Sequence, residues 1–588
     1  MTNENNIENK RHTLAHVLAS ALEKRYQGVK LTLGPAIDTG FYYDIDFTAC
    51  KSKPSSDEDL ATLTNDMKEI LQAGFSFSHR EVTTDEAKAF FKNNKYKLEL
   101  IDEIVARGEQ ITLYSFGEGE NKFTDLCRGG HVENLSEIHI DSFRLDRVAG
   151  AYWRGNEKRE MLTRIYGLAF DNKAELEAYT LQIEEAKKRD HRVLGRELGL
   201  FIFSDLVGPG LPLWTPRGTV LRKQIDNYVQ ELRSEYDYQA VTIPHITKSD
   251  LYKKSGHWEK YAADLYKIDT RDGHVLCMKP MNCPHHTQIY ASELRSYKEL
   301  PIRYSETTMV YRDEQSGELN GLSRVLSITQ DDAHVFCRES QLKEEIGNIW
   351  NLIERFYSTF GFAGITPRFS KRNDDAKYKG NIDLWAKAES VIFDLLEERA
   401  KGKWVDGEGE AAFYGPKIDF MAKDSIGRSH QVGTIQLDYV QPTNFGLEYV
   451  SEEGTRDMPV MIHCAISGSL ERFISVYLEH SAGNFPLWLA PMQVKVIPIK
   501  NEIHLERARS VYSALKKSGV RVELDDEKNG LGKKVRHAKD MKYPYWIVIG
   551  DTEVATGTAT LESREGEKVV LSIDDLVSKF KKEIEEKK

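Results

Sequence analysis

Apolar and polar residues follow different periods in successive parts of the chain. Over residues 10–26 and 56–73 apolar side chains recur every three or four positions, which predicts two amphipathic helices. Between them, LTLGPAIDTGFYYDIDF has strand character around a Gly/Pro/Asp loop, and residues 161–169 form a short apolar run typical of a strand. Residues 173–192 are charged and contain neither Gly nor Pro, so we expect a helical connector there and a domain boundary near Arg189.

The middle and the end of the chain have two further patterns. IRYSETTMVYRDE, SGELNG and LSRVLSITQ follow one another over residues 302–330, and residues 411–440 repeat this arrangement of two β-prone runs around a Gly-containing turn. Such runs favour antiparallel hairpins over βαβ crossovers. Short apolar strands then alternate with amphipathic helices, which predicts a small α/β domain. We therefore predict an α+β multidomain protein with domains at 1–189, 190–489 and 490–588.

Composition narrows the class of protein. A chain of 588 residues is too long for one hydrophobic core, and 40% hydrophobic with 29% charged residues is typical of globular proteins. Without a long apolar run or a targeting segment at the start, we expect a cytoplasmic protein that does not enter membranes. Six scattered cysteines are too few for a disulfide framework. The net charge of −11 disfavours a protein that coats nucleic acid, although the segment after residue 492 has a small basic excess.

Three separated residues could form a metal site. Cys283 lies in MKPMNCPHH, His334 in ITQDDAHVFC, and His463 ends the run PVMIHC just before GSLERF. No short metal signature joins them, and each alone is more often a core residue. Together, one thiolate and two imidazoles would hold zinc with an open fourth position, the arrangement of a metal that touches substrate.

Three arginines suit a phosphate ligand. Arg312 and Arg324 flank one predicted hairpin turn, and Arg472 opens a helix directly after Gly468 and Ser469. A guanidinium fork makes bidentate, permanently charged contacts to phosphate, although ordinary exposed arginines are the simpler interpretation. The chain contains neither G-x-x-x-x-G-K-[ST] nor G-x-G-x-x-G, so an ATP site here would be neither a P-loop nor a Rossmann site.

Two pairs of polar residues share a spacing of four near the start of the chain. His12 and His16 lie on one face of a predicted helix, and CRGGH places Cys127 and His131 around a Gly-Gly bend. These groups could bind a metal or orient a water for hydrolysis. The alternative is a histidine pair that packs on a loop.

These motifs together resemble the threonyl-tRNA synthetases, a family of class II aminoacyl-tRNA synthetases, over nearly the whole chain. YRDE at 311–314 with Arg324 is similar to the second class II motif, and GSLERF at 468–473 to the third. Residues 219–244 are similar to the first, which usually lies at a dimer interface. MKPMNCP and TQDDAH are specific to the threonyl members. The resemblance implies a homodimer with an antiparallel class II catalytic core, an α+β editing domain and a C-terminal anticodon-binding domain.

The resemblance also implies an activity, in which ATP and L-threonine form threonyl-adenylate, the threonyl group passes to tRNA(Thr), and mischarged Ser-tRNA(Thr) is hydrolysed. The residues implied are Cys283, His334 and His463 for Zn²⁺; Arg312, Glu314, Arg324, Ile328 and Arg472 for ATP with Mg²⁺; Asp332, Gln330, Tyr414 and Gln431 for threonine; Arg312, Arg472, Lys417 and His257 for catalysis; His12, His16, Lys97, Asp125, Cys127 and His131 for editing; and Arg536 with Glu553 for the anticodon.

The chain departs from the family at four points. Because the first predicted helix begins within a dozen residues of Met1, we expect no ubiquitin-like domain before the editing domain. Ile328 stands where an aromatic residue usually stacks on adenine, His285 replaces a glycine, and Glu562 stands where a basic anticodon contact is often found.

The chemistry itself argues for two sites. An apolar pocket separates near isosteres such as threonine and valine only by about a hundredfold, which a metal that accepts the threonine hydroxyl would improve. Serine keeps the hydroxyl and lacks one methyl, worth ~1 kcal/mol or roughly tenfold, so a second, hydrolytic site is needed. Whether the hydrolytic site holds a metal stays open.

The alternatives to this function are a related enzyme that activates serine or proline, and a tRNA-binding or regulatory paralogue with reduced catalysis.

Overall fold

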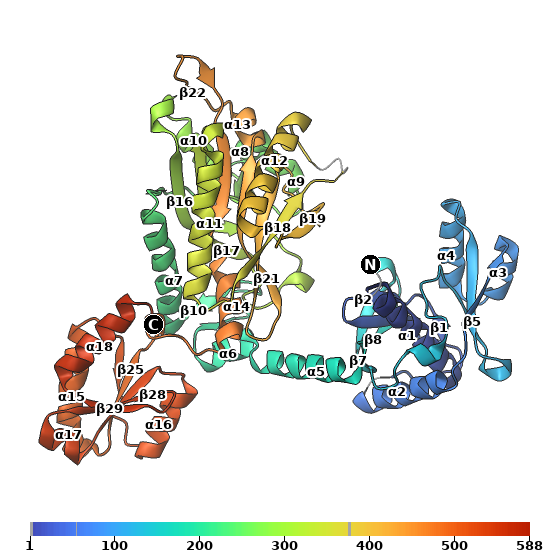
Figure 1. Ribbon diagram of the computed structural model, residues 1–588, viewed down its shortest axis with the longest axis horizontal. Helices are drawn as coiled ribbons and strands as arrows, with labels where there is room; N and C mark the ends of the chain where they lie inside the picture. Colours follow the sequence, from blue (N-terminus) through green and yellow to red (C-terminus); the bar gives the residue numbers. More distant parts are fainter. Residues whose placement is uncertain (1–3, 55, 374–377) are drawn as a thin grey trace. The chain divides into compact units, whose positions relative to one another are not determined.

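The computed structural model describes residues 4–54, 56–373 and 378–588. They form two compact units, Met1–Glu184 and Glu185–Lys588, and each is described by itself (Figure 1). No helix in the described ranges combines the length and the apolar character that crossing a membrane requires.

The first unit contains one larger and one smaller sheet. The larger has the order β1-β3-β8-β7, with β2 paired to β3, and consists of β1 (Lys30–Leu31), β2 (Ala36–Ile37), β3 (Gly40–Asp46), β7 (Phe143–Tyr152) and β8 (Met161–Ala169). Helices α1 (Glu4–Arg25) and α2 (Asp57–Gln72) bury their apolar faces on it, with Leu18, Phe41 and Ile165 in the core. Both expected helices and the expected strand at 161–169 are confirmed.

The smaller sheet of this unit joins β4 (Ser78–Val82), β5 (Ile111–Phe116) and β6 (Phe123–Leu126), with α3 (Thr84–Phe90) and α4 (Lys95–Ala106) packed beside it. The expected connector at 173–192 is only partly confirmed. Helix α5 (Lys173–Lys188) ends before Asp190, whose side chain accepts a hydrogen bond from the Arg192 amide and begins a new helix, α6 (His191–Glu197). An aspartate favours such an N-cap position, which explains the break.

The second unit is built on an eight-stranded sheet with the order β11-β16-β17-β24-β21-β20-β18-β19. Its strands are β11 (Gln239–Ala240), β16 (Ile302–Tyr311), β17 (Ser327–Cys337), β18 (Ile365–Lys371), β19 (Val405–Glu408), β20 (Lys417–Lys423), β21 (Ser429–Asp438) and β24 (Val460–Ala465). All pairings are antiparallel except those of β11 and β19 at the edges. Both predicted hairpins, β16–β17 and β20–β21, are therefore confirmed.

Four long helices cover this sheet: α7 (Pro216–Ser234), α11 (Leu342–Thr359), α12 (Ile382–Ala400) and α14 (Leu470–Ser481). Helix α11 packs on α7, β21 and β24, whereas α12 lies on β18 and α14 on β17 (Figure 1). Ile353, Phe356 and Ile462 belong to the shared core. Residues 219–234, the helical part of the segment that resembles the first class II motif, thus belong to a helix that buries one face in this core.

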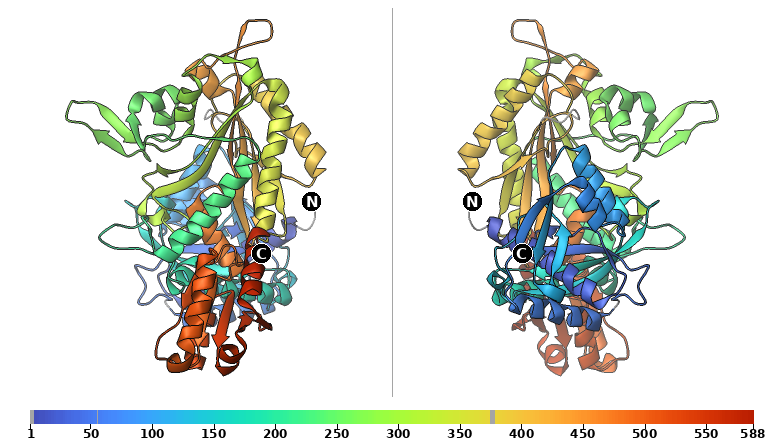
Figure 2. Two further views of the ribbon diagram at one scale, coloured as in Figure 1. Left: turned by 90° about the vertical axis from the view of Figure 1, so that its left-hand side faces the viewer. Right: turned by 90° about the vertical axis from the view of Figure 1, so that its right-hand side faces the viewer.

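Small elements surround the large sheet. The strands are β9 (Phe201–Ile202), β10 (Leu213–Trp214), β12 (Ile246–Lys248), β13 (Lys267–Asp269), β14 (Val275–Met278), β15 (Arg295–Ser296), β22 (Tyr449–Val450) and β23 (Arg456–Asp457). The helices are α8 (Ser249–Ser255), α9 (His257–Lys260), α10 (Cys283–Tyr290) and α13 (Val440–Phe445). Figure 2 shows the hairpin of β13 and β14, in green, projecting to one side of the large sheet.

The C-terminal part has its own five-stranded sheet, β26-β25-β27-β28-β29. It comprises β25 (Val494–Pro498), β26 (Val522–Leu524), β27 (Tyr545–Ile549), β28 (Ala559–Ser563) and β29 (Lys568–Leu571), with α15 (Asn501–Lys517), α16 (Leu531–Asp540), α17 (Asp551–Thr556) and α18 (Ile573–Glu585). The first three strands are parallel, as the alternation of strands and helices predicts. The last two form an antiparallel addition that this alternation did not predict.

Candidate functional site

One face of β17 carries four of the predicted site residues. Side chains alternate between the two faces of a strand, so Ile328, Gln330, Asp332 and His334 share one face. Asp331 points to the opposite face, toward α7. A single strand therefore leads from the predicted adenine contact to the predicted metal ligand.

The register of the sheet places further predicted site residues beside this row, on the neighbouring strands. His334 lies opposite His463 of β24, His463 opposite Gln436 of β21, and Gln436 opposite Lys417 of β20. Directly opposite residues in an antiparallel pair have their Cβ atoms about 4.5–5.5 Å apart. The sheet thus brings together side chains that are far apart in the sequence.

Cys283, His334 and His463 form a buried cluster. Their ligand atoms all lie within 4.8 Å of one another, and His334 Nε2 is 3.1 Å from His463 Nδ1. Cys283 reaches the cluster as the first residue of α10. One thiol and two imidazoles, all buried, are a donor set that fits zinc.

A carboxylate holds one of these imidazoles from behind. Asp438 Oδ2 is 2.8 Å from His463 Nε2, so that His463 Nδ1 is left facing the cluster. The same carboxylate is fixed by the backbone amides of Val440 and Gln441. A carboxylate behind a metal-ligating histidine commonly sets its tautomer and orientation.

Burial controls the protonation of this region. It lowers the pKa of His334 well below the usual range of histidine and raises that of the Cys283 thiol. It also raises the pKa of Asp332 to about 6, although a hydrogen bond from Asn282 opposes the shift. The histidine is therefore neutral, which is the form that binds a metal.

His257 and Tyr414 lie beside the cluster. His257 Nε2 is 3.6 Å from Cys283 Sγ, its Nδ1 is 2.8 Å from Ser255 Oγ, and burial lowers its pKa to about 3. The Tyr414 ring stacks on His463 at a centroid distance of 4.8 Å. Its hydroxyl donates to Gln436 Oε1 at 2.6 Å.

A cavity of about 590 Å³ adjoins this row. The predicted residues that line it are Arg312, Glu314, Arg324, Ile328, Gln330, Gln431 and Arg472. The Arg472 side chain makes no hydrogen bond or ion pair with any described residue, and Arg312 Nε and Gln330 Oε1 are buried without a described hydrogen-bond partner. Arg324 instead pairs with Glu314, with Nη2 2.6 Å from Oε2. A guanidinium group without a partner at a cavity, here that of Arg472, suits an anionic ligand.

Lys417 joins this cavity through a buried carboxylate. Its Nζ lies 2.6 Å from Asp419 Oδ2, and Gln431 Nε2 donates to Asp419 Oδ1 at 2.8 Å. Asp419 is fully buried. The lysine is therefore held in place by an ion pair close to a side chain that lines the cavity.

The first unit contains the second predicted cluster. The ligand atoms of His12, His16, Cys127 and His131 all lie within 4.8 Å of one another. Cys127 Sγ is 3.6 Å from His12 Nε2 and 3.2 Å from His131 Nε2. Burial lowers the pKa of His131 to about 2 and raises that of Cys127 to about 11, so the cluster is uncharged near pH 7.

Lys97 and Asp125 lie next to this cluster as a buried ion pair, with Lys97 Nζ 2.5 Å from Asp125 Oδ1. The Tyr43 hydroxyl donates to Asp125 Oδ2 at 2.6 Å. A cavity of about 410 Å³ is lined by His12, His16, Lys97, Asp125 and Cys127, together with Tyr43. Five of the six predicted editing residues thus face one cavity, and His131 lies behind them against Cys127.

The two predicted anticodon residues lie on different helices, and no described contact joins them. Arg536 on α16 is 83% exposed, and its nearest ion-pair partner is Asp540 at 3.8 Å. Glu553 on α17 accepts hydrogen bonds from the Gly550 amide and from Thr560, which makes it part of its own helix cap.

The structure also locates the three residues that differ from the family pattern. Ile328 lines the 590 Å³ cavity, and Glu562 pairs with Lys568 at 3.2 Å. His285 is buried with its ring against Tyr252, and burial lowers its pKa to about 4.

The sequence interpretation missed several residues of the site. Asn282 and His286 flank Cys283 in MNCPHH, and His286 Nδ1 contacts His334 Nδ1 at 2.8 Å, so their proximity to the predicted ligand was a usable signal. No signal in the sequence pointed to Asp419 and Asp438, because only strand pairing places them beside Lys417 and His463.

Comparison with known protein families gives three matches in order. Residues 111–166 match the threonyl and alanyl tRNA synthetase second additional domain, and residues 266–481 match the tRNA synthetase class II core domain (G, H, P, S and T). Residues 493–583 match an anticodon-binding domain. The fold and these matches define a class II aminoacyl-tRNA synthetase.

Comparison with individual proteins identifies the family within this class. The threonine–tRNA ligase of Gloeobacter violaceus is 45% identical over 570 residues, which cover 95% of this chain and 89% of that protein. The threonine–tRNA ligase of Synechococcus elongatus is 43% identical, covering 98% and 95%. A crystal structure from Cryptosporidium parvum, described as the RNA-binding domain of threonyl-tRNA synthetase, matches with a TM-score of 0.64 at 36% identity and covers 67% of this chain and 98% of that one. The chain belongs to the threonine–tRNA ligase family.

Proposed function

We propose that the chain activates L-threonine with ATP, transfers it to the 3′ end of tRNA(Thr), and hydrolyses mischarged Ser-tRNA(Thr). The single observation that carries the proposal is the row of side chains on one face of β17, which joins the cavity lined by Arg312, Arg324 and Arg472 to the Cys283–His334–His463 cluster. In this proposal residues 1–189 edit, residues 190–489 catalyse and residues 490–588 bind the anticodon.

ATP binds in the 590 Å³ cavity in this proposal. Arg312 and Arg472 neutralise its phosphates, Ile328 packs on the adenine and Glu314 contacts the base, while Mg²⁺ accompanies the phosphates. Adenylate formation needs charge neutralisation and in-line alignment rather than a covalent catalyst. The unpaired Arg472 guanidinium and the orphan Arg312 Nε support this role.

Threonine binds at the end of the same row. Asp332 receives the ammonium group, and Gln330, Tyr414 and Gln431 surround the remainder of the amino acid. Cys283, His334 and His463 would hold a zinc ion, which when bound supplies a Lewis acid that recognises a hydroxyl and so disfavours valine. The fit of the three buried donors supports the zinc assignment.

Transfer to tRNA uses His257 and Lys417. A neutral, buried His257 has one ring nitrogen on Ser255 and the other toward the threonine end of the site, which suits contact with the terminal ribose of tRNA. Lys417, held by Asp419, adds a positive charge near Gln431.

Editing uses the 410 Å³ cavity of the first unit. The uncharged imidazoles of His12 and His16, with Cys127 and His131 behind them, can orient a water toward an ester, and the Lys97–Asp125 pair lies beside them. The four donors would equally suit a metal ion, so metal content is part of the test in the Discussion.

We also propose a cytoplasmic homodimer. The segment of β9 and β10, next to α7, exposes Ile202, Phe203, Leu206 and Leu213, with Leu206 99% exposed. Apolar side chains gathered in this way are typical of a protein interface. Light scattering should then give twice the 67.3 kDa chain mass.

The test of the whole proposal is aminoacylation. Purified protein, a tRNA(Thr) transcript and ATP should give Thr-tRNA with labelled threonine, and no product with labelled proline. Preferential charging with proline or serine would favour a related enzyme, and binding of tRNA without charging by any of the three would favour a paralogue with reduced catalysis.

A further inference from the structure

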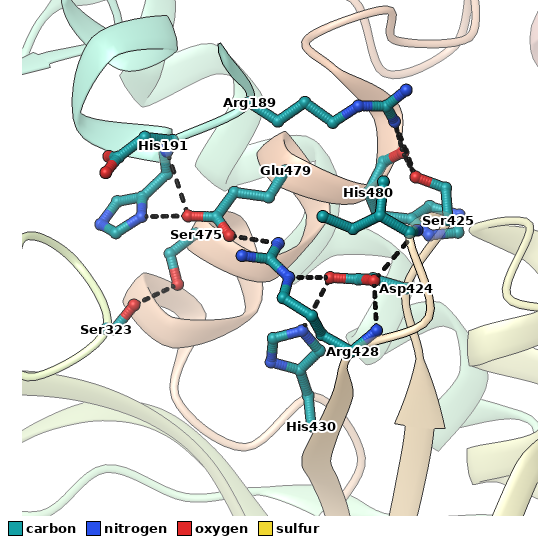
Figure 3. A network of polar contacts seen from close by, with 12 residues as sticks. Arg189, His191, Ser323, Asp424, Ser425, Arg428, His430, Ser475, Glu479 and His480 are labelled. Atoms are coloured by element: carbon teal, nitrogen blue, oxygen red, sulfur yellow. Dashed lines mark hydrogen bonds and ion pairs between the residues drawn. The ribbon is translucent and has the colours of Figure 1, made fainter. Parts of the chain in front are cut away.

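His191, at the start of α6, bridges two parts of the chain that line the ATP cavity. It is buried, and its Nδ1 lies 2.7 Å from Glu479 Oε1 on α14 (Figure 3). Its Nε2 lies 3.1 Å from the backbone nitrogen of Leu322. Its own backbone amide also donates to Glu479 Oε1.

These contacts define the tautomer. A backbone N–H can only donate, so His191 Nε2 accepts the hydrogen bond from Leu322, and the single ring proton is on Nδ1. That proton is donated to Glu479. The turn fits closely on the ring: a Cβ added at Gly321 would lie 2.3 Å from His191 Nε2, so glycine is required there.

The turn held in this way carries Arg324. Leu322 follows Gly321 in the connection between β16 and β17, and Ser323 Oγ makes a second contact, 2.9 Å from Ser475 Oγ of α14 (Figure 3). Arg472 is in the first turn of the same helix. Two contacts therefore fix the position of the Arg324 turn relative to the helix that carries Arg472.

Asp190, His191 and Glu479 resemble a metal site, but their carboxylates already have partners within the protein. Ligand atoms of Asp190, His191 and Glu479 lie within 4.8 Å of one another. However, Asp190 caps α6 and pairs with Arg192, and Glu479 Oε2 accepts from Arg428 Nη2 at 2.5 Å. Because both ring nitrogens are engaged as well, a guanidinium and not a metal ion balances this carboxylate.

We propose that His191 is a positioning residue for ATP. It sets the distance between the Arg324 turn and α14, so that Arg324 and Arg472 face the same ligand. This inference rests on the proposed ATP cavity. Its consequence is specific: loss of the acceptor at Nε2 weakens ATP binding, whereas threonine binding at the other end of β17 is unaffected.

Two substitutions separate the two hydrogen bonds. The amide oxygen of His191→Gln can replace Nε2 as the acceptor for Leu322, whereas the amide nitrogen of His191→Asn can replace only the Nδ1 donor to Glu479. We expect His191→Asn and His191→Ala to raise KM for ATP in pyrophosphate exchange roughly tenfold, the effect of one lost hydrogen bond and the looser turn. His191→Gln should stay within about twofold, and KM for threonine should be unchanged in all three.

The control is Ser425→Ala, which removes contacts to Arg189 and to the backbone carbonyl of His480 in the same network without touching the turn, and should behave as wild type (Figure 3). Calorimetric titration with ATP gives a second readout, Kd, that does not require turnover. Equal effects of the Gln and Asn variants, or a parallel rise in KM for threonine, would overturn the inference. If wild type bound ATP but gave no exchange, the proposed function would fail, while the Kd values would still decide the role of His191.

Discussion

Arg233 and Asp331 form an ion pair in which both side chains are 1% exposed. Arg233, on α7, donates from Nε and Nη2 to Asp331 Oδ1 at 3.0 and 2.5 Å. The other carboxylate oxygen accepts the backbone amides of Ile466 and Ser467, both at 2.9 Å, just after β24. One buried carboxylate on β17 thus connects α7, which belongs to the segment that resembles the first class II motif, with the backbone directly before GSLERF.

Removing the arginine should destabilise the catalytic domain strongly. Arg233→Met leaves Asp331 buried without its counter-charge, which typically lowers the free energy of unfolding by about 3–5 kcal/mol. Urea denaturation followed by tryptophan fluorescence measures this change. The matched control is Arg355→Ala, which breaks an exposed pair with Glu235 and should change stability by about 1 kcal/mol or less. Similar losses in both variants would contradict a special role for the buried pair.

Zinc content should depend on one cysteine. Wild-type protein should contain about one zinc per chain, because three buried donors with an open position are typical of such a site. Elemental analysis should show that Cys283→Ala loses this zinc, whereas Cys337→Ala, which changes an equally buried core cysteine, keeps it. Equal metal in the two variants would refute the assignment. A second zinc that disappears in His12→Ala would instead locate a metal in the editing cluster.

Editing should fail separately from activation. His12→Ala combined with His16→Ala removes two of the groups that face the 410 Å³ cavity, so Ser-tRNA(Thr) should accumulate while threonine activation stays normal. The measurement is deacylation of preformed Ser-tRNA(Thr), which wild type should hydrolyse while sparing Thr-tRNA(Thr). Cys50→Ala, in the same unit, is the control. An unchanged rate of Ser-tRNA hydrolysis in the double variant would show that these histidines are structural.

The C-terminal part should act only through tRNA. Arg536 is exposed on a helix of the five-stranded sheet, so Arg536→Ala should weaken aminoacylation and leave pyrophosphate exchange near normal. Arg472→Ala should abolish both, because it removes the unpaired guanidinium at the ATP cavity. An equal loss of pyrophosphate exchange in the two variants would contradict the assignment of tRNA binding to the C-terminal part and of ATP binding to the cavity with Arg472.

Local patterns predicted the elements, and long-range register produced the sites. The alternation in SITQDDAH is enough to predict a strand and, in principle, to place Gln330, Asp332 and His334 on one face. Nothing local predicts that His334 lies opposite His463, 129 residues later, since packing of the whole sheet sets that register. Asp438 and Asp419 were missed for the same reason.

The break at Asp190 has a different origin. Periodicity alone favours one helix through residues 173–192, and the competing N-cap signal of an aspartate before a helical run was not weighed. The break matters, because it turns His191 toward Glu479 and the Arg324 turn. Contacts of this kind depend on tertiary packing and cannot be derived from a charged helical pattern.

The most direct test of the central claim is amino-acid-dependent exchange of labelled pyrophosphate into ATP. It reports adenylate formation in the region that extends from the cavity lined by Arg472, along β17, to the Cys283 cluster, and it requires no tRNA. Threonine should support rapid exchange, serine should support it roughly tenfold less well because it lacks one methyl, and valine and proline should give none. Exchange that valine supports as well as threonine, or none with threonine, would contradict the account.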